Sequence, residues 1–287
     1  MTDSGSPELS LLVVSWRTRD LLAECLDTIA AELDGLSYEV VVVDNDSGDG
    51  TANLVAERAA ADDRIRPILS DTNTGFAGGN NLAYRASRGE FVGVVNPDLL
   101  VNRDAVYTMV ERLRADPSIG VLSCDLVGMD GRQQTLHRRL PTLTNLLFTR
   151  TRWGGRFDRI VLRRWFDRRL RLADVPRHGL RDIGQAAGAF LFLRRATIEG
   201  PLGGELFDEK LEILVNDVDL SRRVHDAGLR VAVDYDRRVM HHGGGSLRQL
   251  DRTTQERHLF EGFAHYFAKH EPPWKLRLFR LLCGGKV

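Results

Sequence analysis

The first half of the chain alternates between short apolar runs and longer segments in which apolar residues recur at helical spacing. The apolar runs predict four buried strands, at residues 9–16, 38–45, 65–71 and 91–97. The segments between them predict three helices, at 19–33, 49–61 and 78–88. Apolar strands that alternate with amphipathic helices are typical of a mostly parallel sheet covered on both faces. The pattern therefore predicts an α/β fold.

The second half of the chain has a less regular pattern. Apolar residues at 186–198 predict a strand that runs into a helix, and those at 230–236 predict another strand. Residues 217–229 have the spacing of a helix that ends at Gly228. Three glycines, 243–245, follow a pair of histidines and predict a loop that a ligand can approach closely.

Polar residues follow all four strands predicted in the first half. They are Ser15-Trp16-Arg17, Asp44-Asn45-Asp46, Asp71-Thr72-Asn73 and Asn96-Pro97-Asp98. The carboxyl ends of parallel strands meet at one edge of a sheet, and ligands of such folds bind beyond that edge. These side chains are therefore expected to converge on one site.

The group Asn96-Pro97-Asp98 interrupts an apolar run at its centre. A hard divalent cation prefers oxygen ligands and retains phosphate oxygens in its shell. Asp98 is therefore a candidate to hold such a cation against a diphosphate. A turn or a helix cap is the alternative interpretation of the same residues.

Three further groups are candidates for chemistry. Asp217 or Asp219, set between apolar residues, is suited to act as a general base, although acids at a helix start also favour the helix dipole. His241 and His242, beside the glycine loop, are candidates for a metal ligand or a phosphate donor, although most single histidines only pack. The glycine-rich segment 73–81 is suited to a phosphate but fits neither the dinucleotide fingerprint nor the phosphate-loop pattern.

Composition narrows the range of partners and compartments. Lys+Arg and Asp+Glu both number 40, so net charge does not favour nucleic acid as a partner. The three cysteines have no metal-ligand spacing and fit a reducing compartment. The chain has no signal-peptide pattern and no apolar run near the roughly 20 residues that span a bilayer. We therefore expect a soluble, cytoplasmic protein.

Positive charge gathers in one segment, 138–181, which contains thirteen arginines and three aspartates. Within it, residues 157–172 alternate arginine pairs with apolar and aromatic residues, and residues 271–287 have a similar mixture. A basic amphipathic helix is typical of a membrane surface. A helix that packs on the rest of the protein with a solvated arginine face is the alternative.

Taken in order, these motifs resemble the nucleotide-sugar-dependent glycosyltransferases of family 2, which have the GT-A fold. The matching segments span about residues 10–246 and read VVSWRTRDLLAECLDTI, VVVDNDSGDGT, NTGFAGGNNLA, FVGVVNPDLLV, GAFLFLRRATI, FDEKLEILVNDVDLSRRVHDAGLRV and VMHHGGGS. Within the family the pattern is closest to bacterial rhamnosyltransferase-like enzymes that build cell-surface polysaccharides.

The resemblance implies a division of the chain. Residues 1–246 would form a single GT-A catalytic domain with a Rossmann-like, mostly parallel sheet. Its nucleotide-binding half would span about 9–118 and its acceptor-side half about 119–246, with a basic helical insertion at about 138–181. Residues 247–287 would form a C-terminal helical extension.

The resemblance also implies roles for individual residues. The donor nucleotide and its diphosphate would be held by residues at the strand ends and in the glycine-rich segment, namely Val14, Trp16, Arg17, Asp44, Asn45, Asn73, Gly79, Asn80, Asn96 and Asp98. Asn96 stands where the family has the first acid of its Asp-x-Asp motif, so Asp98 would carry most of the contact with Mg²⁺ or Mn²⁺, and His241 would complete the metal site. Asp217 would be the base, since Asn216 replaces an acid usual in the family; Asp219 is the second candidate.

The implied reaction is an inverting, metal-dependent transfer of a sugar, with rhamnose from dTDP-rhamnose expected first, to a saccharide or lipid-linked saccharide acceptor. A UDP-hexose transferase of the same fold and a non-catalytic nucleotide-sugar-binding module are the alternatives. A nucleotidyltransferase fits less well, because SWRTRDLL (15–22) lacks the glycine-rich loop that such enzymes place after the first strand. Lipid-linked acceptors would place the protein at the inner face of the cell membrane.

Overall fold

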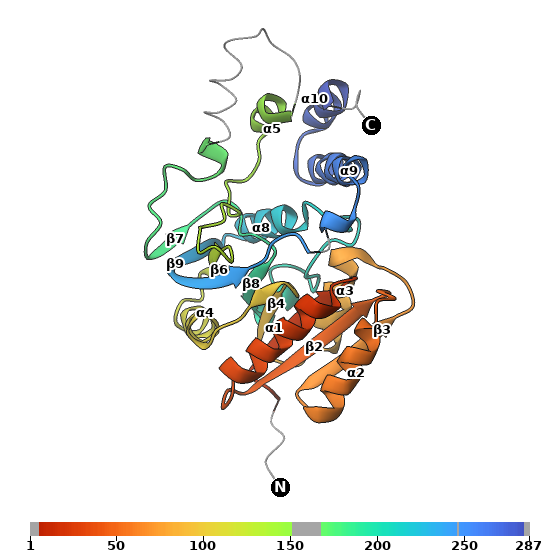
Figure 1. Ribbon diagram of the computed structural model, residues 1–287. Coiled ribbons are helices and arrows are strands. Elements are labelled where there is room, and N and C mark those ends of the chain that lie inside the picture. The colour runs from red at the N-terminus through yellow and green to blue at the C-terminus, as the bar shows by residue number, and fades with distance from the viewer. Residues whose placement is uncertain (1–5, 151–167, 246, 284–287) are drawn as a thin grey trace.

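The computed structural model describes residues 6–150, 168–245 and 247–283 (Figure 1). Within these residues, nine strands form one sheet in the order β3-β2-β1-β4-β8-β6-β9-β5, and β7 pairs with β9. The strands are β1 (Leu9–Ser15), β2 (Tyr38–Asn45), β3 (Ile65–Ser70), β4 (Phe91–Val95), β5 (Leu99–Leu100), β6 (Ile119–Val127), β7 (Leu180–Asp182), β8 (Phe190–Arg194) and β9 (Arg230–His241). All strands predicted from the sequence are present.

The sheet is mostly parallel, as expected. The pairs β1–β2, β2–β3, β1–β4 and β6–β9 are parallel. Strand β8 runs antiparallel to both of its neighbours, β4 and β6, and so joins the two parallel parts of the sheet. The carboxyl ends of β1, β2, β3 and β4 consequently lie at one edge.

Helices cover both faces of the sheet. The helices are α1 (Arg19–Glu32), α2 (Thr51–Ala61), α3 (Gly75–Ala86), α4 (Arg103–Ala115), α5 (Leu143–Arg150), α7 (Arg195–Glu199), α8 (Asn216–Asp226), α9 (Arg252–His270) and α10 (Pro273–Cys283), with a short 3₁₀ helix η1 (Leu247–Gln249). Residues of α1, α2 and α4 pack with one face of the central strands, and residues of α3, α7 and α8 pack with the other. Strand β2 is buried along its whole length because Val40 and Val42 face the first cluster while Val41 and Val43 face the second.

A third apolar cluster joins α5, α9 and α10, which lie together at the top of Figure 1. Tyr266, Phe267 and Phe279 are almost completely buried in this cluster. The predicted C-terminal helical tail is therefore present as α9 and α10. Most of the predicted basic helix at 157–172 lies outside the described residues.

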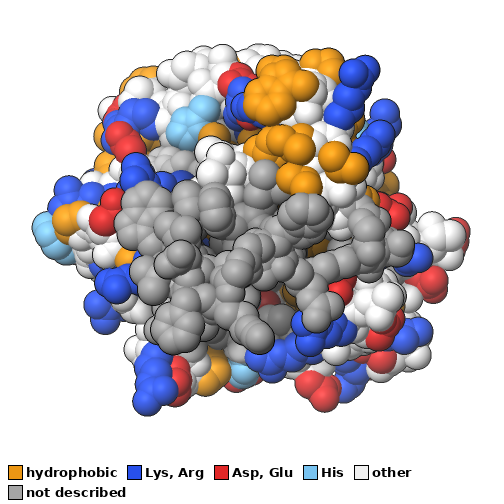
Figure 2. All heavy atoms as spheres, turned by 90° about the horizontal axis from the view of Figure 1, so that it is seen from above, with side chains coloured by type: hydrophobic (Ala, Val, Ile, Leu, Met, Phe, Trp, Pro, Cys, Tyr) orange, Lys and Arg blue, Asp and Glu red, His pale blue; other side chains and the backbone are white. Residues whose placement is uncertain are grey.

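Helix α10 leaves part of its surface uncovered. Trp274 is 57% exposed and Leu281 is 77% exposed, and Lys275, Arg277 and Arg280 belong to the same helix. Figure 2 shows hydrophobic side chains beside Lys and Arg side chains on the face of the molecule seen from above. No described helix is long and apolar enough to cross a bilayer.

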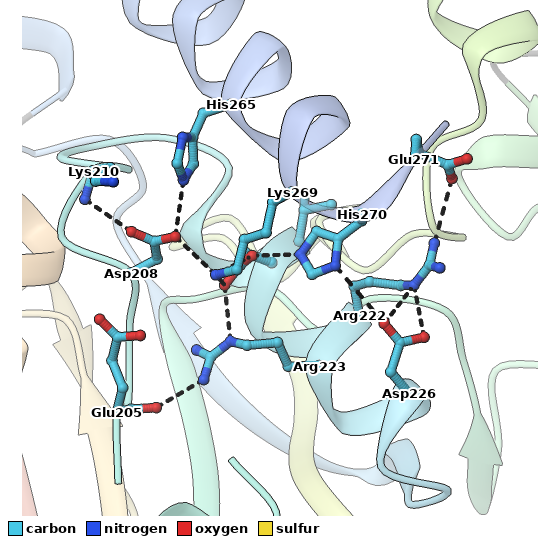
Figure 3. Close-up of polar contacts among 12 residues, drawn as sticks. Glu205, Asp208, Lys210, Arg222, Arg223, Asp226, His265, Lys269, His270 and Glu271 are labelled. Carbon is cyan, nitrogen blue, oxygen red and sulfur yellow. Dashed lines mark hydrogen bonds and ion pairs between the residues drawn. The ribbon is translucent and has the colours of Figure 1, made fainter. Parts of the chain in front are cut away.

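A network of charged residues fastens α9 to α8 (Figure 3). The fully buried Asp219 of α8 accepts hydrogen bonds from His270 Nε2 at 2.7 Å, from Arg223 Nε at 2.9 Å and from Lys269 Nζ at 3.1 Å. Lys269 also donates to Asp208, at 2.7 Å, in the loop before α8. Burial raises the pKa of Asp219, and its basic partners more than offset this, so the pKa lies below its usual value. Asp219 therefore serves as an anchor for the C-terminal helices.

Candidate active site

A cavity of about 1290 Å³ opens at the carboxyl edge of the sheet. Eight residues predicted for the site line it, namely Val14, Trp16, Asn45, Asn73, Asn96, Asp98, Asp217 and His241. Four others are not among its described lining residues: Arg17, Asp44, Gly79 and Asn80. The strand ends therefore converge, and they bring the two candidate carboxylates, Asp98 and Asp217, into one cavity.

The break after β4 places Asp98 beside His241. The N–H of Asn96 still donates to the sheet, to Ala189 O at 2.9 Å, and the chain then turns through Pro97. It resumes as β5, in which Leu99 pairs with His241 at the end of β9. As a result, Asp98 Oδ1 lies 3.3 Å from His241 Nε2, and both side chains are almost fully buried. The polar interruption thus serves to bring a carboxylate and an imidazole together.

Gln134 fixes the proton position on the His241 ring. The Gln134 amide donates its Nε2 to the carbonyl oxygen of His241 at 2.7 Å, which leaves Oε1 facing His241 Nδ1 at 2.6 Å. Since Oε1 can only accept, Nδ1 carries a proton, and a neutral ring would turn its Nε2 lone pair toward Asp98. Such a partner behind the ring is typical of metal-ligating histidines.

The pair formed by Asp98 and His241 fits a divalent cation. Asp98 Oδ1 and His241 Nε2 are buried and have no hydrogen-bond partner among the described residues. Two buried lone pairs so close to each other are unfavourable unless a positive charge lies between them or beside them. No group of three or more His, Cys, Asp or Glu side chains in the described ranges could hold a metal, so a cation here would need further ligands from phosphate and water.

Asp98 is ionised in this setting. Burial raises its pKa, but the neighbouring His241 ring, when it is protonated, and the N–H of Gly245, which donates to Asp98 Oδ2 at 3.2 Å, more than offset the effect. The pKa of Asp98 therefore lies below its usual value. The glycine loop supplies this donor from close range, since Gly243 and Gly244 adopt positive φ angles of 82° and 73°.

Asp217, in the first turn of α8, presents a carboxylate suited to accepting a proton. Its Oδ2 accepts hydrogen bonds from Gln185 Nε2 at 2.9 Å and from Gly188 N at 3.2 Å, and its Oδ1 accepts one from Val218 N at 2.9 Å. Burial raises the pKa of Asp217, although these donors and the nearby Arg138 partly oppose the effect. A carboxylate with a raised pKa is a stronger base than one in water.

The loop that holds Asp217 is itself supported by a buried histidine. His137 Nε2 lies 2.8 Å from Cys124 O and its Nδ1 accepts from Ala187 N at 3.2 Å, which fixes a neutral tautomer with the proton on Nε2. Burial lowers the pKa of His137 to about 4. Gly188 follows directly, and a Cβ there would lie 3.3 Å from Asp217 Cβ. The chain therefore approaches the carboxylate closely because residue 188 has no side chain.

The residues predicted to bind the nucleotide divide into a lining set and a supporting set. Asn45 lines the cavity, but its amide also organises the 73–75 loop, donating to Asn73 Oδ1 at 2.9 Å and accepting from Thr74 N at 2.9 Å. Gly79 lies directly behind Val14, where a Cβ would meet Val14 Cγ1 at 2.6 Å.

The remaining predicted residues also lie behind or beside the lining. Asn80 is buried and donates to Phe76 O at 2.8 Å, and Asp44 is buried and accepts from Ser47 N at 3.2 Å. Arg17 places its guanidinium 5.1 Å from the centre of the Trp16 ring. These residues support the walls of the cavity, while Trp16 itself faces it.

Sequence reasoning missed the residues that orient the two candidate groups. Gln134 and Gln185 lie in irregular segments, where hydrophobic periodicity gives no signal. The position of Gln185, just before the small residues Ala186, Ala187 and Gly188, was the available hint, because chains of small residues allow close approach. Gln134 had no such signal.

The comparisons with known proteins agree with this architecture. The sequence model of glycosyl transferase family 2 matches residues 10–171, more than half of the chain. The succinoglycan biosynthesis protein ExoO of Rhizobium meliloti is 33% identical over 211 residues, which make up 69% of this chain and 60% of ExoO. The O-antigen biosynthesis protein RfbC of Myxococcus xanthus is 26% identical over 258 residues, 85% of this chain and 18% of RfbC. The chain thus spans less than two thirds of the length of either relative.

Two solved structures share the fold. The mannosyltransferase PcManGT from Pyrobaculum calidifontis, in complex with GDP-Man and Mn²⁺, has a TM-score of 0.62 at 22% identity and covers 96% of this chain and 68% of its own. TarS from S. aureus has a TM-score of 0.55 at 18% identity and covers 92% of this chain and 72% of its own. Together with the match over residues 10–171, these findings establish that the chain has a GT-A type fold and belongs to glycosyl transferase family 2.

Proposed function

We propose that the protein is an inverting glycosyltransferase that moves a sugar from a nucleotide diphosphate donor to a hydroxyl group of an acceptor. The observation that carries the proposal is the presence of Asp98 and Asp217 in one cavity at the carboxyl edge of the sheet. One carboxylate is ionised beside a histidine, and the other has a raised pKa. A module that only binds a nucleotide sugar has no need for the second.

Asp217 acts as the general base in this scheme. Its carboxylate takes the proton from the acceptor hydroxyl as that oxygen forms a bond to the anomeric carbon. The bond between the anomeric carbon and the phosphate oxygen breaks on the opposite side, and its electron pair leaves with the nucleoside diphosphate. A single displacement of this kind inverts the anomeric configuration. Gln185 and Gly188 hold the base in place through the two hydrogen bonds to Oδ2.

Asp98 and His241 would hold Mg²⁺ or Mn²⁺, with Gln134 fixing the imidazole. When bound, the cation neutralises negative charge on the departing diphosphate. The buried lone pairs of Asp98 Oδ1 and His241 Nε2 support this assignment. Trp16, Val14, Asn45, Asn73 and the nearby Asn96 would surround the nucleotide, while Arg17, Asp44, Gly79 and Asn80 would support those residues from behind.

The donor and the pathway are proposed from the similarity of this chain to known proteins. Two relatives are named for succinoglycan and O-antigen biosynthesis, so we place this chain in the assembly of a cell-surface polysaccharide. Its resemblance to rhamnosyltransferase-like enzymes makes dTDP-rhamnose the first donor to test and UDP-hexoses the next. GDP-mannose joins the screen because it is bound in the Pyrobaculum structure. Residues 1–246 would carry the catalysis and 247–287 would close the acceptor side.

The proposal is tested by a thermal-shift screen of these nucleotide sugars with Mg²⁺ or Mn²⁺. A donor at about 100 times its Kd stabilises the folded state by about 2.7 kcal/mol. Asp98→Ala should lose the metal-dependent part of the shift, and the matched change Asp71→Ala, at an exposed strand end outside the described lining of the cavity, should retain it. Release of nucleoside diphosphate in the presence of an acceptor supports transfer. Release of pyrophosphate, or binding without turnover, would contradict it.

We also propose that the protein associates with an anionic membrane surface through α10 and the arginine-rich segment 138–181. The exposed Trp274 and Leu281 lie among Lys275, Arg277 and Arg280, a combination that favours an interface between water and lipid. The protein should sediment with anionic liposomes at low salt and release as salt rises, because salt screens the attraction. Equal recovery in the supernatant with and without liposomes would exclude this association.

A further inference from the structure

The helical turn that carries Asp217 begins at a residue in an unfavourable backbone conformation. Val215, immediately before α8, has φ 73° and ψ −4°, which lies in the left-handed region. The non-glycine residues with a positive φ in the described ranges are Arg17, Asp46, Leu172 and Val215, and Val215 is the β-branched one among them. A β-branched side chain crowds the backbone there, so the conformation persists only when its surroundings impose it.

The conformation of Val215 sets the start of α8. Its carbonyl oxygen accepts the N–H of Asp219 at 2.9 Å, a hydrogen bond of the first helical turn. Asp217 lies between these two residues. The direction in which α8 leaves Val215 therefore decides where the Asp217 carboxylate lies relative to its donors, Gln185 and Gly188.

Helix α9 packs directly against Val215. Gly262 of α9 is buried, and a Cβ at this position would lie 2.9 Å from Val215 Cγ2, 3.2 Å from Val215 Cβ and 3.1 Å from Leu214 O. Contacts this short would force one of the two segments to move, so a glycine is needed for α9 to come this close. Val215 itself is 4% exposed and belongs to the third apolar cluster, together with residues of α9.

The same helix also holds the residue on the other side of Asp217. Asp219 is fully buried and accepts hydrogen bonds from His270 and Lys269, which lie at the C-terminal end of α9 (Figure 3). A buried carboxylate is unfavourable without such partners. Helix α9 thus contacts the residues two before and two after Asp217, and the two contacts lie about two turns apart along α9. Each contact offsets an unfavourable feature of the turn that carries Asp217.

We propose that α9 positions the general base. Gly262 holds Val215, and Lys269 and His270 hold Asp219, so that the first turn of α8 presents Asp217 to the cavity. These are positioning residues, because they act through Asp217. The inference rests on the proposed role of Asp217 as the base. It gives α9, which is remote in sequence from the strand-end motifs, a part in catalysis.

Amide hydrogen exchange in the full-length protein, without donor or acceptor, tests the structural part of this inference. Alanine favours a helix more than glycine does, so Gly262→Ala would stabilise α9 if nothing lay against it. We expect instead that the new methyl group displaces Val215 and that the Asp219 amide exchanges at least about tenfold faster. Adding Val215→Gly to the same chain removes both Val215 atoms that the methyl group would meet and supplies a residue that adopts a positive φ freely. The exchange rate should then return toward the wild-type value.

Steady-state kinetics tests the catalytic part. The donor is the nucleotide sugar that the thermal-shift screen selects from dTDP-rhamnose, UDP-hexoses and GDP-mannose. Displacing a reacting group by about 1 Å can cost about 10²-fold in rate, so kcat for nucleoside diphosphate release should fall at least about tenfold in Gly262→Ala. The KM for the donor should stay within about twofold, because the donor site is unchanged. The double variant should recover most of the lost kcat.

Phe267→Leu is the matched control. It loosens the same apolar cluster from within α9, and Phe267 is not among the described lining residues of the cavity. This variant should lower the melting temperature, since a large buried side chain is made smaller. It should leave both kcat and the exchange of the Asp219 amide within about twofold of the wild-type values.

Two changes at His270 test the second contact. His270→Leu removes a hydrogen-bond partner of the buried Asp219 carboxylate and should speed exchange of the Asp219 amide. His270→Gln keeps an N–H that can donate to Asp219 and should retain most of the wild-type protection. Circular dichroism checks that every variant is folded, and the His270 pair decides the inference if Gly262→Ala is not.

The inference is overturned if the Asp219 amide exchanges at the wild-type rate in Gly262→Ala, if the double variant recovers nothing, or if Phe267→Leu changes exchange and kcat as much as Gly262→Ala does. Equal exchange in His270→Leu and His270→Gln would overturn it as well, and an unchanged kcat in Gly262→Ala would overturn the part of α9 in catalysis. Failure of the proposed base is a separate result, because Asp217→Asn decides it by turnover, whereas exchange is measured without donor or acceptor.

Discussion

Replacing Gln185 by leucine should raise the pH at which the enzyme begins to lose activity in acid. Gln185 Nε2 donates the shorter of two hydrogen bonds to Asp217 Oδ2, at 2.9 Å against 3.2 Å for Gly188 N. Both bonds stabilise the ionised carboxylate and oppose the effect of burial, which raises the pKa of Asp217. Leucine has a similar size and no donor, so the variant keeps the burial and loses one of the opposing contributions.

The size of the effect follows from the bond that is lost. A hydrogen bond to a charged group contributes about 1.5–3 kcal/mol, and one pKa unit corresponds to about 1.4 kcal/mol. The pKa of Asp217 should therefore rise by about 1–2 units in Gln185→Leu. A general base must be deprotonated to work, so the acid limb of kcat/KM against pH should move upward by the same amount. At pH values well above that limb, activity should change much less.

The assay is nucleoside diphosphate release at a series of pH values with saturating metal. Gln133→Leu is the matched control, because Gln133 Nε2 caps another buried acid, Asp125, at 2.5 Å, and it is not among the described lining residues of the cavity. It should leave the acid limb in place even if it lowers stability. An acid limb that does not move in Gln185→Leu, or that moves equally in Gln133→Leu, would refute the assignment of Asp217 as a base tuned by Gln185.

Three further changes test the framework around the site. Asp219→Ala leaves several basic side chains without their buried partner and should cost about 3–5 kcal/mol of stability in thermal unfolding, whereas Asp226→Ala, in a more exposed ion pair of the same helix, should cost at most about 1 kcal/mol. The His137 side chain binds a proton near pH 6.5 in the unfolded chain but only near pH 4 in the folded protein, so this residue lowers the stability of the fold as the pH falls between these values. Its contribution to the loss of stability between pH 7 and 5 is about 2 kcal/mol. That part of the loss should be absent in a folded His137→Gln variant, as measured by urea unfolding. Gly79→Ala should push Val14 into the cavity, raise KM for the donor and lower the stability of the fold by about 1–3 kcal/mol. Adding Val14→Ala to the same chain should restore part of the KM and part of the stability, a rescue that a merely local folding defect would not give.

Hydrophobic periodicity was enough to predict most of the strands and helices of the fold. The uniformly apolar β2 could be recognised because a strand covered on both faces has no polar side. Its residues Val40–Val43 point alternately into the two hydrophobic clusters on either face of the sheet. The strand β9 was predicted to end at residue 236 but extends to His241. Its last part alternates between exposed and buried positions and is held by the two-residue strand β5, which is too short to give a periodic signal.

Most of the site residues that could be predicted follow strand ends, and Asp217, at the start of a helix, is an exception. Asp98, Asn45 and Trp16 could be placed at one edge because parallel strands share it. Gly79 and Asn80 were expected near the nucleotide. Their helix, α3, packs against β1, and the Val14 side chain lies between Gly79 and the cavity. Gln134 and Gln185 act through contacts with residues 107 and 32 positions away, to His241 and Asp217. Such contacts depend on tertiary packing, so local sequence does not reveal them.

The most direct test of the account compares donor binding and sugar transfer in the Asp217→Asn variant. Asparagine preserves the size of the side chain but cannot take a proton at neutral pH. The account predicts a donor Kd within about twofold of the wild-type value and a fall in transfer of about 10²–10⁴-fold, the usual contribution of a general base. A folded Asp217→Asn protein that transfers sugar at the wild-type rate would contradict it.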